Sequence, residues 1–308
     1  MKALVFGWLI ITIATRSACT ERALDYRGDD GMVVITPDWS SFASPSSACY
    51  RFYRADDGKK VNYGTDMFAS AEYFSVVLPV GDYHLLAYNT NTNDVTFTGL
   101  EERRLAEVCL IPGMQPGNIY SWHVDNVDIP LQGTVRYTPV PRRLVKQMWL
   151  HFQVTGMEEA TILNGKLNGV YPSVFLLSGA PSEQSISAAP LTNAEFTVAL
   201  TRGKTRETEL VYMASAEIRL LGLLSPEYGI SYDSRLYLQV HNSSGKTYDT
   251  SVNMNRILTD IINLYAGELP VDETIEVNIN VNLLDMVLSA VVESWTEGSG
   301  EGYIGTHK

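Results

Sequence analysis

The sequence predicts an all-β protein with one short helix. Apolar residues recur with a period close to two along most of the 308 residues, which indicates strands that bury one face. Gly, Asp and Asn residues that favour tight turns separate these runs. After removal of an N-terminal leader, about 290 residues remain, enough for two domains that each bury a core. We therefore expect two sheet-forming domains in tandem.

In the first half, the clearest element is a hairpin over residues 78–89. Its turn contains Gly81, which accepts a positive φ angle, and Asp82, which can bond its own backbone. Apolar runs with the same period predict further strands at 32–35, 50–53, 74–78, 95–97 and 122–129. The segment 133–143 contains Pro139 and Pro141, and we interpret it as a linker.

The second half contains the most regular strand of the chain. Ile275, Val277, Ile279, Val281 and Leu283 alternate with Glu276, Asn278, Asn280 and Asn282, so one face is apolar and the other almost wholly amide. Other strands are expected at 148–154, 195–200, 209–213, 217–221 and 235–240. The predicted helix spans 255–266, where apolar residues form one broad face and Gly267 can end it.

The N-terminus has the layout of a secretory signal, since Lys2 precedes an uncharged stretch over 3–15 that is too short to cross a bilayer. The small residues before Cys19 resemble a bacterial lipobox, so Cys19 is the predicted lipid attachment site. Arg16 departs from that pattern. The alternative is an ordinary signal cleaved near Ala18, which leaves Cys19 as a thiol.

These observations predict the following organisation of the chain. We expect a lipoprotein signal peptide at 1–18, a tether at 19–31, an N-terminal domain at 32–138, a C-terminal domain at 139–297 and a flexible tail at 298–308.

The charge of the chain disfavours nucleic acid as a partner. Removal of residues 1–18 takes away Lys2 and Arg16 and no acidic residue, so the net charge falls from −12 to −14. Such a surface repels phosphate groups. Proteins that bind nucleic acid obtain most of their affinity by neutralising phosphate groups with Lys and Arg side chains. Besides Cys19, the chain has Cys49 and Cys109. In an exported protein they either form a disulfide or stay as two buried thiols, and the sequence does not decide between them.

Motifs for catalysis or metal binding are missing from the sequence. The five histidines are scattered and the cysteines form no C-x-x-C pair, so we expect no metal site and no cofactor. There is no G-x-S-x-G elbow and no phosphate-binding loop, so we expect no enzyme. The loop over 89–94 could ligate Ca²⁺ through its oxygens, but a turn between strands is the simpler interpretation.

Several segments together are similar to a known family. They are the Trp-bearing first strand over 33–39, Tyr50-Arg51-Phe52-Tyr53, and the run from Leu78 to Thr90 that contains the predicted hairpin. The region 163–177, the helix near residue 256, the alternating strand to Leu283 and a last strand with Trp295 agree with it. The chain resembles the fimbrillin-like surface lipoproteins of Bacteroidales, above all the FimB-type and Mfa-like anchor proteins and an uncharacterised sister family.

The resemblance implies two tandem transthyretin-like β-sandwiches, held at the outer membrane by a lipid on Cys19 and exposed at the cell surface. It implies a fimbrial anchor or minor subunit in cell adhesion that binds a pilin by β-strand addition. The strand from Ile275 to Leu283 is the candidate for this contact, and the alternative is a central strand of the second sandwich. Our second hypothesis is a surface module that binds a glycan or a host surface.

Overall fold

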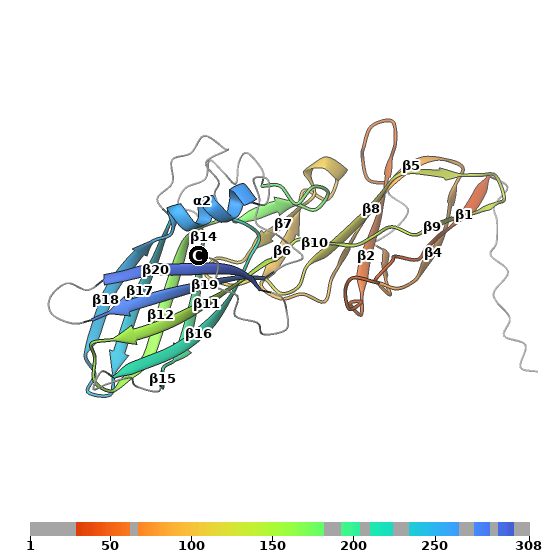
Figure 1. The fold of residues 1–308 in the computed structure, drawn as a ribbon. Coiled ribbons are helices and arrows are strands. Elements are labelled where there is room, and N and C mark those ends of the chain that lie inside the picture. The colour runs from red at the N-terminus through yellow and green to blue at the C-terminus, as the bar shows by residue number, and fades with distance from the viewer. Residues whose placement is uncertain are drawn as a thin grey trace, which may run out of the picture.

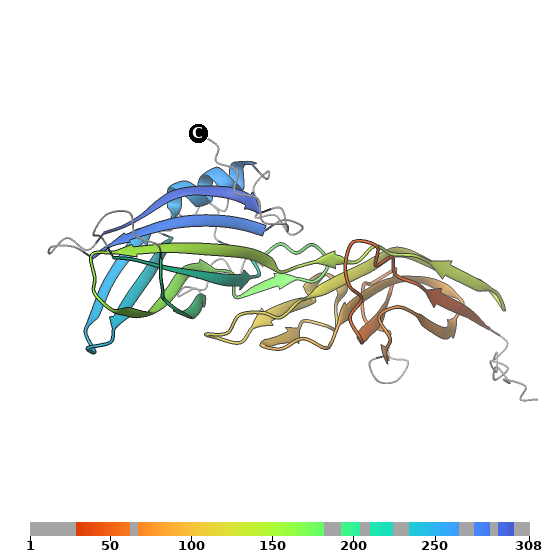
Figure 2. The same ribbon diagram turned by 60° about the horizontal axis from the view of Figure 1, so that its bottom comes forward.

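The computed structural model describes residues 29–61, 67–181, 192–203, 210–223, 234–264, 274–283 and 289–298. It confirms the all-β prediction, because strands form five sheets and α2 (Asn255–Leu264) is the one α-helix of the described part. Figures 1 and 2 show an elongated molecule in which the sheets follow one another from end to end.

Two sheets pack face to face at the N-terminal end. The smaller has the order β4 (Phe74–Pro79), β1 (Asp30–Ile35) and β9 (Thr134–Tyr137). The larger has the order β10 (Arg142–Arg143), β8 (Tyr120–Ile129), β5 (Gly81–Asn89), β2 (Ala48–Arg54) and β3 (Met67–Ala69). Aromatic residues fill the core between them, where the ring of Tyr50 stacks on that of Phe74 with centroids 4.2 Å apart.

A middle sheet joins the two ends of the molecule. Its strands are, in order, β13 (Ser173–Phe175), β7 (Glu107–Leu110) and β6 (Val95–Thr98). β6 and β7 come from the first half of the chain and β13 from the second, so main-chain hydrogen bonds cross between the halves. The buried core crosses as well, because Leu86 and Tyr88 of β5 belong to the same apolar cluster as Phe152 farther along the chain.

Two further sheets form a sandwich at the C-terminal end (Figure 1). One has the order β15 (Thr201–Arg202), β16 (Val211–Leu220), β11 (Lys146–Thr155), β19 (Thr274–Asn282) and β20 (Ser289–Gly298). The other has the order β14 (Thr192–Ala199), β12 (Ala160–Val170), β17 (Arg235–Asn242) and β18 (Thr247–Asn253). Alternate residues of both sheets bury their side chains in one shared core, to which α2 adds Ile257, Leu258, Ile261 and Ile262.

The predicted linker over 133–143 is not a linker in the structure. β9 pairs in parallel with β1, and β10 pairs with β8, so most of this segment completes the N-terminal sheets. Its prolines lie between the two strands, at positions where no ladder hydrogen bond is lost. The domain boundary after residue 138 stays a prediction.

The signal peptide, Cys19 and most of the tether lie outside the described residues, and β1 begins at Asp30. The tail beyond Gly298 also lies outside them. Within the described ranges, α2 is too short to cross a membrane, and no other helix meets the requirement either.

Candidate functional site

The strand predicted to bind a partner is the central strand β19. It pairs in parallel with β11 along one side and antiparallel with β20 along the other, so both of its edges are occupied. The five predicted aliphatic side chains are all buried, namely Ile275, Val277, Ile279 and Val281 in β19 and Leu283 directly after it. As folded here, β19 has the second of the two roles that the sequence left open, and it presents no edge to an incoming strand.

The edges of this five-stranded sheet lie at β20 and at β16, which the short β15 covers only in part. β15 pairs with Tyr212 and Met213 alone, and no other described strand continues along the outer edge of β16. The amide of Arg219 points outward, because it donates to the side chain of Gln115 rather than to β11. Amides of alternate residues face the same side of a strand, so those of Ser215 and Glu217 also point outward.

Gln115 connects the two sheets of the C-terminal sandwich at this edge. Its Oε1 accepts a hydrogen bond from the amide of Arg219 in β16, at 2.8 Å. Its Nε2 donates to the carbonyl oxygen of Glu195 in β14, at 2.7 Å. Gln115 lies in the connection between β7 and β8, so a residue of the first half of the chain closes the side of the second sandwich.

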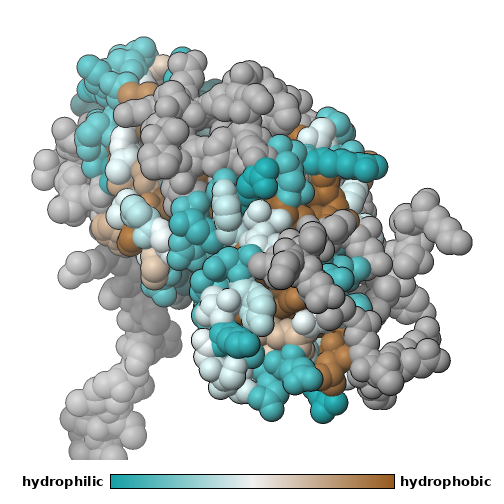
Figure 3. All heavy atoms as spheres, turned by 90° about the vertical axis from the view of Figure 1, so that its left-hand side faces the viewer, coloured by the Kyte–Doolittle hydropathy of each residue, from teal (hydrophilic) through white to brown (hydrophobic). Residues whose placement is uncertain are grey.

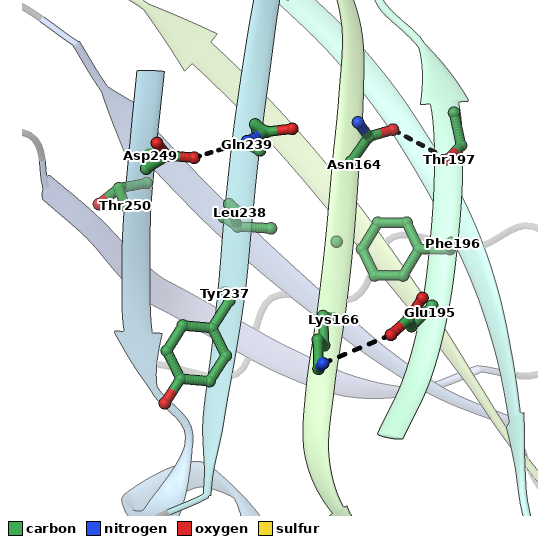
Figure 4. A pocket seen from close by; sticks show the side chains of 11 residues that line it. Asn164, Lys166, Glu195, Phe196, Thr197, Tyr237, Leu238, Gln239, Asp249 and Thr250 are labelled. Atoms are coloured by element: carbon green, nitrogen blue, oxygen red, sulfur yellow. Dashed lines mark hydrogen bonds and ion pairs between the residues drawn. The ribbon is translucent and has the colours of Figure 1, made fainter. Parts of the chain in front are cut away.

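A hollow of about 810 Å³ lies on the outer face of the four-stranded sheet. Two neighbouring cross-strand rows of side chains line it, as Figure 4 shows. One row contains Tyr237, Lys166 and Glu195, and the other contains Asp249, Gln239, Asn164 and Thr197. These residues alternate along their strands with the buried side chains that face the core, which places them on the opposite face.

Hydrogen bonds hold the second row in place. Gln239 donates to Asp249 at 2.9 Å, and Thr197 donates to the side-chain oxygen of Asn164 at 2.9 Å. The ring nitrogen Nε2 of His241 lies 3.0 Å from Oε1 of Gln239 and 3.0 Å from Nδ2 of Asn164, so it either donates to Gln239 or accepts from Asn164. The hydrogen bonds within these pairs orient the amide and carboxylate groups of the row.

The first row contains the ion pair between Lys166 and Glu195, whose charged atoms are 3.5 Å apart. Beside it Tyr237 is 45% exposed. Figure 3 shows the end of the molecule that carries this sandwich, where hydrophilic residues are mixed with smaller hydrophobic areas. The alternation of Tyr237 with buried Leu236 and Leu238 is the sequence signal that places it on the outer face.

Three residues on the outer face of the five-stranded sheet have the composition of a catalytic triad. Nδ1 of His151 lies 2.8 Å from Oγ of Ser215, and Nε2 lies 3.6 Å from Glu276. Ser215 is in the middle of a strand, whose amides point within the plane of the sheet and not toward the side-chain oxygen. Within the described part of the chain, no backbone amide of β16 is therefore directed as an oxyanion hole toward Ser215, and the three residues form a polar cluster on the face of the sheet.

A charged cluster fixes the short helix η1 (Arg103–Leu105) to β8. The guanidinium group of buried Arg103 donates to the carboxylate of exposed Asp125, and this hydrogen bond lowers the pKa of Asp125. His123 lies 3.9 Å from the same carboxylate. Burial lowers the pKa of His123, although the charge of Asp125 acts in the opposite direction.

The remaining predicted residues lie apart from these surfaces. Cys49 is buried in β2, Cys109 lies in β7 of the middle sheet, and no disulfide joins them. In the loop over 89–94, the side chain of Asn89 bonds main-chain groups of Asn118 and Tyr120, which favours the turn over a Ca²⁺ site. The described residues contain no cluster of three metal-ligating side chains.

The structure is similar to solved structures of candidate adhesins from Bacteroides. A candidate adhesin from Bacteroides ovatus is 17% identical, with a TM-score of 0.50 over 84% of this chain and 96% of that chain. A second from the same species is 14% identical, with a TM-score of 0.51 over 91% and 99%. A third, from Bacteroides thetaiotaomicron, is 12% identical, with a TM-score of 0.51 over 84% and 93%. No protein-family model and no curated protein sequence matches the chain.

At sequence identities of 12% to 17%, the comparison shows similarity of the fold alone. The chain has the fold of these candidate adhesins over most of its length, and the predicted resemblance to fimbrillin-like proteins is confirmed at the level of the fold.

Proposed function

We propose that the protein acts at the cell surface in adhesion, as a fimbrial anchor or minor subunit without enzymatic activity. The similarity of its fold to candidate adhesins supports this role. We further propose that a lipid on Cys19 holds the protein at the outer membrane and that its partner is a pilin.

The observation that carries the pilin contact is the edge of β16, where no described strand is hydrogen-bonded beyond β15, although β14 of the other sheet lies close to it. Strand addition obtains its affinity from main-chain hydrogen bonds between an edge strand and an extended segment of the partner. Because β19 is enclosed by β11 and β20, we place the addition at Ser215 to Arg219 in β16 instead. The amides of Ser215 and Glu217 point outward there, between the short β15 and the contact with Gln115.

The variant Ser215→Pro tests this contact. Proline removes an outward amide without removing a hydrogen bond to β11, so an edge strand can retain its fold. We expect Ser215→Pro to reduce the binding of purified pilin from the same bacterium by about tenfold or more, measured by surface plasmon resonance. The control Ser215→Ala retains the amide and should bind as the parent does.

Circular dichroism must show that both variants are folded. Equal pilin binding by folded Ser215→Pro and by the parent would refute strand addition at β16. The absence of pilin binding by the parent protein would refute the pilin as its partner.

A further inference from the structure

The side chains that line the hollow on the outer face of the four-stranded sheet have no part in the proposed strand addition. The hollow lies over the middle of the sheet, and the side chains of all four strands line it. We propose that it is a binding site for a neutral saccharide, with the ring of Tyr237 as the surface on which one sugar ring stacks. This inference goes beyond the proposed function and rests on a different part of the molecule.

The first argument is the exposure of Tyr237. Tyr237 is 45% exposed in the interior of a sheet, between Lys166 on one neighbouring strand and Ser251 on the other. A sugar ring has one face of C–H groups, and these groups carry a slight positive charge. They pack well on the electron-rich face of an aromatic ring. A bound sugar would therefore cover the apolar surface that Tyr237 exposes to solvent.

The second argument is the spacing of the polar groups. Gln239 and Asn164 each lie two residues along the strand from Tyr237 and Lys166, so the two rows are about 7 Å apart. A sugar ring stacked on Tyr237 would present its hydroxyl groups to the row of Gln239, Asn164 and Asp249. Hydrogen bonds already orient the side chains of that row. Binding of a sugar therefore immobilises few further side chains and costs little conformational entropy.

The third argument is charge, which selects the class of saccharide. The hollow contains the carboxylates of Glu195 and Asp249 and one cation, Lys166, which is already paired with Glu195 at 3.5 Å. The protein as a whole is acidic, with a net charge of −12. Sialylated or sulfated sugars would be repelled, whereas amide and carboxylate oxygens accept hydrogen bonds from neutral hydroxyl groups.

The experiment starts with a printed array of neutral and sialylated oligosaccharides, followed by titration calorimetry with the neutral glycan that gives the strongest signal. We expect Tyr237→Ala to weaken binding by about tenfold and Tyr237→Phe, which retains the ring, to bind within about threefold of the parent. Tyr73→Ala is the matched control, because Tyr73 is 53% exposed and lies at the other end of the molecule.

The array and the variants can each overturn the proposal. Binding only to sialylated glycans, or to no glycan, would refute a neutral saccharide site. Neutral glycan binding that Tyr237→Ala leaves unchanged would place the saccharide elsewhere on the protein. A loss of pilin binding in Ser215→Pro is measured separately, so failure of the saccharide site and failure of strand addition are distinguishable.

Discussion

The ion pair between Arg103 and Asp125 joins a buried cation to an exposed anion. The side chain of Arg103 is 9% exposed and that of Asp125 is 73% exposed. Burial of a guanidinium group is costly without a partner, and the carboxylate reduces that cost. The contact therefore stabilises η1 on β8 only while Asp125 is ionised.

The lowered pKa of Asp125 gives a prediction about acid stability. A carboxyl whose pKa is lower in the folded than in the unfolded protein stabilises the fold above its unfolded pKa. This contribution is lost as the pH falls through the folded value. Between about pH 5 and pH 3, Asp125→Asn should therefore lose less stability than the parent, measured by urea denaturation. Asp128→Asn, on the same strand, is the control; an equal acid loss in Asp125→Asn and the parent would contradict the prediction.

At the scale of single elements, β19 is the strand whose surroundings restrict its sequence most. Alternate side chains of β19 face the core, and both of its edges pair with neighbouring strands. A charge on the core face has no polar partner there, whereas a charge on the outer face meets the amide row and solvent.

We therefore predict that Ile279→Asp unfolds the C-terminal sandwich or destabilises it by more than about 4 kcal/mol, measured by urea denaturation. The neighbouring substitution Asn280→Asp lies on the outer face and should change the free energy of unfolding by less than about 1 kcal/mol. A stable Ile279→Asp protein would mean that β19 does not hold its central position in solution.

The regular elements could be predicted because their pattern is local. The strand over 275–283 is β19, and the helix over 255–266 is α2 with its first residue correct. The predicted hairpin over 78–89 is wrong, because β4 pairs with β1 in one N-terminal sheet and β5 pairs with β2 and β8 in the other. The two predicted strands over 209–213 and 217–221 are one strand, β16, because antiparallel pairing with β11 continues through Ala214 and Ala216. Small residues at these positions weaken the pattern without ending the strand.

The pairing between distant segments could not be predicted. Asn164-Gly165 in β12 has the composition of a turn, yet Gly165 lies within the strand. A Cβ atom there would lie 1.9 Å from the ring of Phe196, so the ring occupies the space that glycine leaves. The hollow depends on four strands from two separated parts of the chain, and the contact of Gln115 spans 80 and 104 residues.

At the scale of the whole molecule, the proposed attachment and the proposed binding surfaces belong to opposite halves. In Figures 1 and 2 the chain enters β1 at one end of the molecule, and the sandwich with β16 and β17 forms the other end. A lipid on Cys19 would therefore leave the binding surfaces pointing away from the membrane.

We predict that Cys19→Ala releases the protein from the outer membrane, because stable attachment needs the lipid chains that this cysteine would carry. The measurement is the distribution of the protein between membrane and soluble fractions. Cys109→Ala, which changes a cysteine of the middle sheet, should stay in the membrane fraction. Equal membrane retention of Cys19→Ala and the parent would show that no lipid on Cys19 is needed.

The middle sheet has a mechanical consequence for a protein held at one end and pulled at the other. Tension between the ends passes through the covalent chain near β9 and β10. It also passes through the hydrogen bonds between β7 and β13, because these strands come from opposite halves. Two lobes joined by a single flexible segment would swivel under load. Here the pairing of β13 with β7, the shared apolar core and the contacts of Gln115 also connect the halves, and we expect them to resist such rotation.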